Sequence, residues 1–149
     1  MAYHYIDSGL DNIYLENGYT VHKTSYGEGI SIQDAEGLHR AIGKRLISQR
    51  YPLNGAEFRF LRMEMELTQN ALAGLIGSTE QNVRRWETAK KKDVQGPADR
   101  MLRVLYNEYV GGDGSVRRMV DRLAELDMVD RTKVCLRETD QGWRDSILY

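Results

Sequence analysis

Apolar residues recur every three or four positions through the middle of the chain, the period of helices that bury one face. Thr68 is a typical N-cap. Gly77 supplies a tight turn, and either Ser78 or Thr79 can cap the next helix. Pro97 suits the first position of a further helix. The side chains predicted to form the core are Phe58, Leu61, Leu72, Leu75, Val83 and Trp86, followed by Met101, Leu102, Leu105 and Tyr106.

The N-terminal part of the chain has a strand-like pattern instead. Residues 12–24 form short alternating runs on either side of Asn17 and Gly18, a pair that favours a tight hairpin turn. Residues 26–29 predict a second turn, and residues 30–32 predict a third short strand. From Asp34, a candidate N-cap, the period changes to that of a helix. Side chains expected to pack in this segment are Ile13, Leu15, Tyr19 and Val21.

The C-terminal residues predict one helix and a pair of strands. Ser115 is a candidate cap for an amphipathic helix over residues 116–126. Residues 132–137 alternate in the manner of a strand, where Cys135 would be a small buried hydrophobe, and residues 140–142 turn the chain into a returning strand.

These patterns predict a mainly α protein. Residues 51–55 break the first helix and make a plausible boundary. We expect a small β-rich segment at residues 1–54, a helical domain at 55–111, and a C-terminal helix and strand extension at 112–149.

Composition narrows the class of protein and its cellular compartment. An apolar fraction of 41% is enough to form a core. The single cysteine excludes an internal disulfide framework and a thiolate-cluster zinc site, and we expect neither metal nor cofactor. The sequence has no signal-peptide pattern and no apolar run long enough to span a bilayer, so we expect a cytoplasmic protein without a membrane partner.

The charge is small overall but unevenly distributed. The formal net charge is −1, yet Arg84, Arg85 and the lysines at 90–92 lie close together near the single acid Glu87. Such a run is either an ordinary solvated helix face or a surface that binds an anion. The major groove of DNA is wide enough to admit the second helix of a pair joined by a glycine turn.

The residue types on this second helix suit contacts with DNA. Gln81 and Asn82 can pair with the N6 and N7 edge of adenine, and Arg85 can bind O6 and N7 of guanine. Arg84 would read bases or position the helix. Glu80 could accept from cytosine N4, or it could repel phosphate and interact with the helix dipole. The lysines would contact backbone phosphates.

This stretch resembles the helix–turn–helix of the Cro/repressor (XRE) family over about residues 57–110. The shared positions are Leu67, Thr68, Gln69, Leu72, Ala73, Ile76, Gly77, Ser78, Val83, Trp86 and Glu87. The resemblance implies that Gln69 contacts the phosphate backbone and that Glu80, Gln81 and Arg85 face the bases. A glutamate at position 80 is less usual in that family.

The order of segments also resembles MqsA-family antitoxins, which are autoregulatory DNA-binding partners of bacterial RNase toxins. The similarity is strongest between Glu57 and Tyr106. In that family the N-terminal domain is a zinc ribbon with paired cysteines, whereas this chain has Ser8 and Gly9 where a Cys-Gly pair would be expected. The N-terminal segment therefore cannot hold that zinc. The sequence does not decide whether the protein binds a cognate toxin.

We expect a sequence-specific double-stranded DNA-binding repressor, of the antitoxin autorepressor type and homodimeric. The dimer surface would involve Leu105 and Tyr109 or the helix at 116–126, although these stripes equally suit an intramolecular core. An adaptor that binds proteins on the same scaffold is the alternative. An enzyme and an RNA-binding protein are disfavoured, because the three histidines are scattered and no aromatic platform is evident. The expected DNA-binding residues are Gln69, Thr79, Glu80, Gln81, Asn82, Arg84, Arg85, Lys90 and Lys91.

Overall fold

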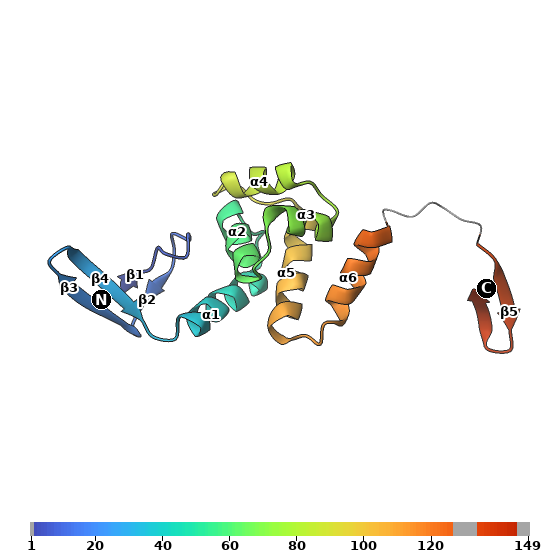
Figure 1. Cartoon of the computed structure of the whole chain (residues 1–149), viewed down its shortest axis with the longest axis horizontal. Coiled ribbons are helices and arrows are strands. Elements are labelled where there is room, and N and C mark those ends of the chain that lie inside the picture. The colour runs from blue at the N-terminus through green and yellow to red at the C-terminus, as the bar shows by residue number, and fades with distance from the viewer. Residues whose placement is uncertain (1, 127–133, 146–149) are drawn as a thin grey trace.

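A computed structural model describes residues 2–126 and 134–145 of the chain, apart from the side chain of Leu126. Over these residues it contains six helices and three separate two-stranded antiparallel sheets (Figure 1). The helices are α1 (Ala35–Ser48), α2 (Gly55–Glu64), α3 (Gln69–Ile76), α4 (Glu80–Thr88), α5 (Gly96–Gly111) and α6 (Ser115–Leu126). The strands are β1 (Tyr3–His4), β2 (Tyr14–Leu15), β3 (Tyr19–Thr24), β4 (Gly27–Ile32), β5 (Leu136–Thr139) and β6 (Gly142–Asp145). The predicted mainly helical class is confirmed.

The helix boundaries follow local capping chemistry. Thr68 Oγ1 accepts the N–H of Ala71 at 3.0 Å, and Thr79 Oγ1 accepts the N–H of Asn82 at 3.1 Å, so both threonines are N-caps. Between α3 and α4, Gly77 has a φ of 71°, a left-handed conformation that glycine adopts without a steric penalty. The predicted start of α1 at Asp34 is also confirmed.

One hydrophobic core joins all six helices. α2 and α5 lie at its centre, with α1 packed against both, α4 packed against α2 and α3, and α6 packed against α3 and α5. Fully burying a large apolar side chain contributes about 1.5–3 kcal/mol. The most deeply buried apolar side chains are Leu53, Phe58, Leu61, Leu72, Val83, Leu102 and Tyr106. Leu75 and Trp86 are only half-buried, and the Trp86 ring packs edge-on against Phe58.

The prediction of a hairpin turn at Asn17 and Gly18 was wrong. β2 pairs with β1, and β3 pairs with β4 through a two-residue turn at Ser25 and Tyr26. Thr24 Oγ1 stabilises this turn, because it accepts the N–H of Tyr26 and donates to the Gly27 carbonyl. Residues 27–29, expected to be a turn, therefore belong to strand β4.

Packing in the N-terminal segment also differs in part from the prediction. Leu15 is buried, and Ile13 and Tyr19 pack against the core while remaining partly exposed. Val21 is 48% exposed, because β3 and β4 form a two-stranded ribbon to which no other strand of the described residues is added. The sequence alternation in β3 therefore does not indicate a buried face.

Two details of the C-terminal prediction were wrong. Ser115 is the first residue of α6 and not its cap; its N–H donates to Asp113 Oδ1 at 2.9 Å. Cys135 directly precedes β5 and is exposed, as are the side chains on both faces of the β5–β6 hairpin. The predicted returning strand is confirmed by the pairing of β5 with β6, whereas residues 132–133 and 147–148 lie outside the described residues.

Within residues 2–126 and 134–145, no helix combines the length and apolar character needed to cross a membrane.

Candidate nucleic-acid interface

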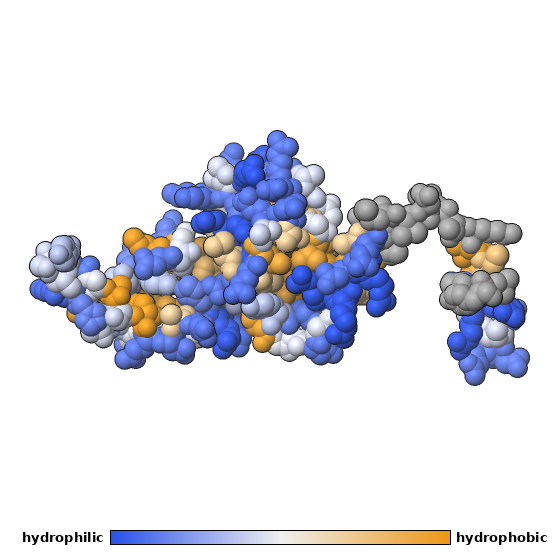
Figure 2. Space-filling view, viewed as in Figure 1, coloured by the Kyte–Doolittle hydropathy of each residue, from blue (hydrophilic) through white to orange (hydrophobic). Residues whose placement is uncertain are grey.

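One side of α4 presents a stripe of polar side chains to solvent. Gln81, Arg84, Arg85 and Thr88 are all exposed, and they recur at the spacing that places residues on one helix face. On the opposite side, Val83 is fully buried against α2 and α3. The helix lies along one edge of the molecule (Figure 1), and the surface over it is hydrophilic (Figure 2). The outward orientation expected of Gln81 and Arg85 is therefore present.

The two arginines of this stripe differ in their surroundings. Arg84 Nη2 lies 3.0 Å from Glu80 Oε1 one turn earlier, and both side chains are about half exposed. An exposed pair of this kind contributes at most about 1 kcal/mol. Arg85 has no ion-pair partner among the residues that the structure describes. The Arg85 guanidinium is therefore more available than that of Arg84 for contact with a binding partner.

Asn82 is held by the turn that precedes α4. Its Nδ2 donates to Ser78 Oγ at 3.1 Å, its own N–H is capped by Thr79, and its side chain is half-buried. Through these bonds Asn82 and Thr79 stabilise the start of α4. The bond to Ser78 uses one of the two N–H groups on Nδ2, so the other N–H and Oδ1 can still bond elsewhere.

Beneath α4, Glu87 is buried and forms a bidentate ion pair with Arg62 of α2. Arg62 Nε lies 2.6 Å from Glu87 Oε2, and Arg62 Nη2 lies 2.8 Å from Glu87 Oε1. The exposed fractions of these two side chains are 8% and 3%. Arg62 Nη1 also donates to the Leu67 carbonyl at 2.7 Å, so this one guanidinium connects α4 to the turn before α3.

Gln69 joins the same network. Its Nε2 donates to Glu87 Oε1 at 3.1 Å, and its side chain is half-buried at the start of α3. The residue predicted to contact phosphate is thus positioned by Glu87 in this structure. Sequence reasoning did not identify Arg62, although its position four residues after Phe58 places a cation on the apolar face of α2.

The lysines at 90–92 are exposed and fixed through their backbone. The carbonyls of Lys90 and Lys92 accept the N–H groups of Ala56 and Gly55 at 3.2 and 3.1 Å. The start of α2 can approach this closely because position 55 is a glycine; a Cβ there would overlap the carbonyl oxygen of Trp86. The lysine side chains therefore extend from a defined position beside α4.

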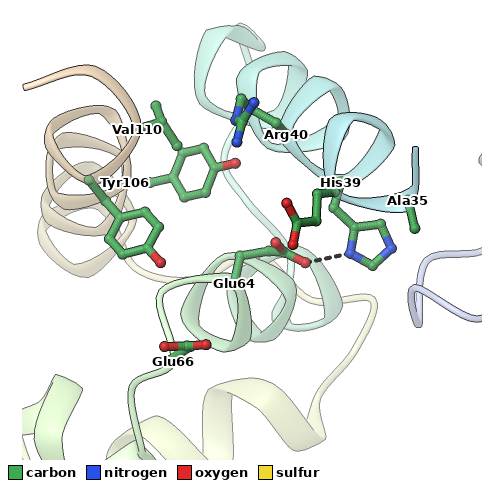
Figure 3. A pocket seen from close by; sticks show the side chains of 9 residues that line it. Ala35, His39, Arg40, Glu64, Glu66, Tyr106 and Val110 are labelled. Atoms are coloured by element: carbon green, nitrogen blue, oxygen red, sulfur yellow. Dashed lines mark hydrogen bonds and ion pairs between the residues drawn. The ribbon is translucent and has the colours of Figure 1, made fainter.

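A second cluster that the sequence did not reveal connects the N-terminal segment to α1 and α2. His39 Nδ1 lies 2.5 Å from Glu64 Oε1 (Figure 3), and His39 Nε2 lies 2.7 Å from the hydroxyl of Tyr5. Because a carboxylate only accepts, the neutral ring carries its proton on Nδ1 and accepts the Tyr5 hydroxyl on Nε2. Burial raises the pKa of Tyr5, and the nearby carboxyls of Asp7 and Glu64 raise it further.

Among the described residues, no group of three or more histidine, cysteine, aspartate or glutamate side chains is arranged to hold a metal ion. Comparisons of the chain with protein-family models, with curated proteins and with solved structures found no match.

Proposed function

We propose that this protein is a sequence-specific DNA-binding repressor of the helix–turn–helix type, in which α4 enters the major groove. The observation that carries the proposal is the exposed stripe of α4 opposite a fully buried Val83. A helix of this kind can place Gln81 and Arg85 against base edges while its rear face is held by the core.

The burial of Glu87 makes this surface more basic than the sequence indicates. Glu87 lies among the cations of residues 84–92, but its charge faces Arg62 and is withdrawn from solvent. The only acid left on the exposed side of α4 is Glu80, which faces Arg84. Arg85 and the three lysines are thus left to attract phosphates, which dominate the affinity of proteins for DNA.

Residue roles under this proposal follow from the positions of the side chains. Gln81 and Arg85 read bases, and Arg84 either reads or positions the helix. Lys90 and Lys91 bind phosphates, since they extend from a backbone fixed to α2. Gln69 contacts a phosphate from the start of α3. Thr79 and Asn82 shape the start of α4, and Glu80 limits the orientation of Arg84.

The biological role that we propose is autorepression of the antitoxin type by a cytoplasmic homodimer. Leu105 is buried within the chain and is unavailable for a dimer contact, whereas Tyr109 is 54% exposed. On α6, Met119 and Leu123 are also exposed. Two copies joined through Tyr109 or through the exposed residues of α6 could read two half-sites, as two-fold symmetric regulators do.

The same exposed residues of α6 favour the second candidate, an adaptor that binds another protein. Under either proposal the protein acts by binding and not by catalysis. The histidines support this view, because His4 bonds the Asp11 carbonyl, His22 bonds Ser31, and His39 bonds Tyr5 and Glu64. They do not converge on one site.

The deciding experiment measures binding to the DNA upstream of the protein's own coding region by fluorescence anisotropy. A shuffled duplex of the same length and composition is the control. We expect tighter binding to the upstream duplex, with an affinity that falls as salt rises. Equal affinity for both duplexes, or no binding to either at low salt, would overturn the repressor proposal and favour the adaptor.

A further inference from the structure

One face of the β5–β6 hairpin combines apolar and acidic side chains. Paired residues of an antiparallel ladder project to the same face, and the pairs on this face are Leu136 with Asp145 and Glu138 with Trp143. Leu136 is exposed, and Trp143 is 68% exposed. These two side chains occupy diagonal positions, which an aromatic side chain can span, so they form one apolar patch beside two carboxylates.

This face of the hairpin is open to solvent in the part of the chain that the structure describes. The hairpin stands apart from the helices (Figure 1), and the side chains of both strands are exposed. An isolated two-stranded hairpin is at best marginally stable in water. On its other face Arg137 lies directly opposite Arg144, and like charges in this arrangement are destabilising. We therefore expect the apolar patch to be covered by a partner.

Helix α6 carries a second exposed apolar surface. Val120 is buried in the core, whereas Met119 and Leu123 are exposed. They are four residues apart and therefore lie together along the helix surface. Arg122 lies beside them, three residues after Met119, and forms no ion pair within residues 2–126 and 134–145. The apolar pair of α6 is thus bordered by an available cation.

The charges of the two surfaces are complementary. Residues 115–126 contain three arginines and two carboxylates. Arg117 Nε lies 3.3 Å from Asp121 Oδ1, so the remaining charged side chains of α6 are two arginines and Glu125. The hairpin face carries two carboxylates and no cation over residues 136–145. An apolar pair beside a cation can therefore meet an apolar pair beside carboxylates, which favours one register of contact.

We propose that the hairpin of one copy docks on α6 of a second copy. Its apolar patch would pack against Met119 and Leu123, and Glu138, directly opposite Trp143, would pair with Arg122. A second copy is favoured over the same chain, because one chain holds both surfaces and does not bring them together (Figure 1). Reciprocal exchange forms the contact twice about a two-fold axis. The homodimer of the proposed function, on which this contact rests, is thereby closed by exchanged hairpins.

Sedimentation equilibrium of the full-length chain in DNA-free buffer measures the dissociation constant of the dimer. Arg122→Glu and Glu138→Arg should each weaken self-association by at least about tenfold, because each brings like charges together at both contacts. Arg137→Glu, on the other face of the hairpin, is the matched charge-reversal control and should keep the wild-type constant. A monomeric wild-type chain, or wild-type association in both reversals, would overturn the proposal.

The apolar part of the contact is tested through Trp143. Trp143→Ser should weaken self-association more than either charge reversal does, since large aromatic side chains dominate the affinity of interfaces. Its melting temperature should match that of the wild-type monomer, because Trp143 lies outside the hydrophobic core. An unchanged dissociation constant in Trp143→Ser would exclude the hairpin from the interface.

An equimolar mixture of the two charge reversals separates exchange between copies from docking within one chain. In a mixed dimer of Arg122→Glu and Glu138→Arg, the substituted helix of one chain meets the substituted hairpin of the other, and the second contact is wild type. The mixture should therefore associate about as tightly as the wild-type chain, although each variant alone does not. A mixture that stays as dissociated as its components would overturn exchange between copies.

DNA binding is measured separately, so that the two proposals can fail independently. A dimer that loses association in both reversals but shows no preference for the upstream duplex would overturn the repressor proposal alone. A wild-type chain that prefers this duplex but dimerises without the hairpin would overturn the exchanged contact alone.

Discussion

Arg62 and Glu87 are 25 residues apart in the sequence and form a bidentate ion pair beneath α4. The pair fixes the rear of α4 to α2 and removes a negative charge from the surface that we propose binds DNA. Gln69 donates to the same carboxylate, so the last turn of α4 is joined to the start of α3.

Removing one member of this buried pair should destabilise the fold. Glu87→Gln is expected to lower the free energy of unfolding by about 3–5 kcal/mol, since the buried Arg62 guanidinium is left without an anionic partner. Urea denaturation measures the change. The exposed pair offers a control: Glu80→Gln should cost no more than about 1 kcal/mol. A similar small loss in Glu87→Gln would show that the buried pair does not hold α4.

Arg85 should contribute to base recognition more than Arg84 does. Arg85→Ala is expected to weaken binding to the cognate duplex by about 1–3 kcal/mol and to relax preference at one base pair. Arg84→Ala should cost less, because that guanidinium is shared with Glu80. Anisotropy on a panel of single-base variants of the duplex measures both effects. Equal losses on cognate and shuffled DNA would exclude a base-reading role for Arg85.

Lys91 should act through phosphate alone. Lys91→Ala is expected to weaken binding to all duplexes alike and to reduce the slope of log affinity against log salt by roughly one unit. Lys23 on strand β3 provides the matched control, since it is an exposed lysine distant in sequence from α4. An unchanged slope in Lys91→Ala would place this lysine outside the phosphate contacts.

Stability should fall at alkaline pH because of two buried tyrosines. Burial raises the pKa of Tyr5 and of Tyr106 above the ordinary value of 10.0. The unfolded chain therefore loses these protons at a lower pH than the folded protein does. The two tyrosines contribute their full stabilisation below pH 10.0, and this contribution is lost as the pH rises past their raised pKa values in the folded state.

The corresponding variants separate this effect from other titrations. Tyr106→Phe and Tyr5→Phe should each flatten the decrease in unfolding free energy above pH 10.0, measured by urea denaturation across a pH series. Tyr5→Phe should also cost about 1 kcal/mol at neutral pH, because His39 loses its hydrogen bond. Tyr26→Phe, at a fully exposed position, is the control. If both variants lost unfolding free energy above pH 10.0 as steeply as the wild type, the two tyrosines would not be the cause of the alkaline decrease.

The helices and their caps could be predicted because their causes are local. Thr68, Gly77 and Thr79 determine where α3 and α4 begin and end through bonds within a few residues. The apolar period then determines which side of each helix is buried, as Val83 and Leu72 illustrate. The strand pairing was less predictable, because Asn17 and Gly18 favour a turn locally but β3 pairs with β4 through Ser25 and Tyr26.

The sequence by itself determined the helical class and the outward position of Gln81 and Arg85, since a period of 3.6 residues relates burial to spacing. Only the tertiary structure decided which charges remain on the surface. Glu87 meets Arg62, and His39 meets Tyr5 and Glu64, across distances along the chain that no local pattern encodes. A buried charge requires a partner, but the sequence does not state which of many cations the fold will bring to it.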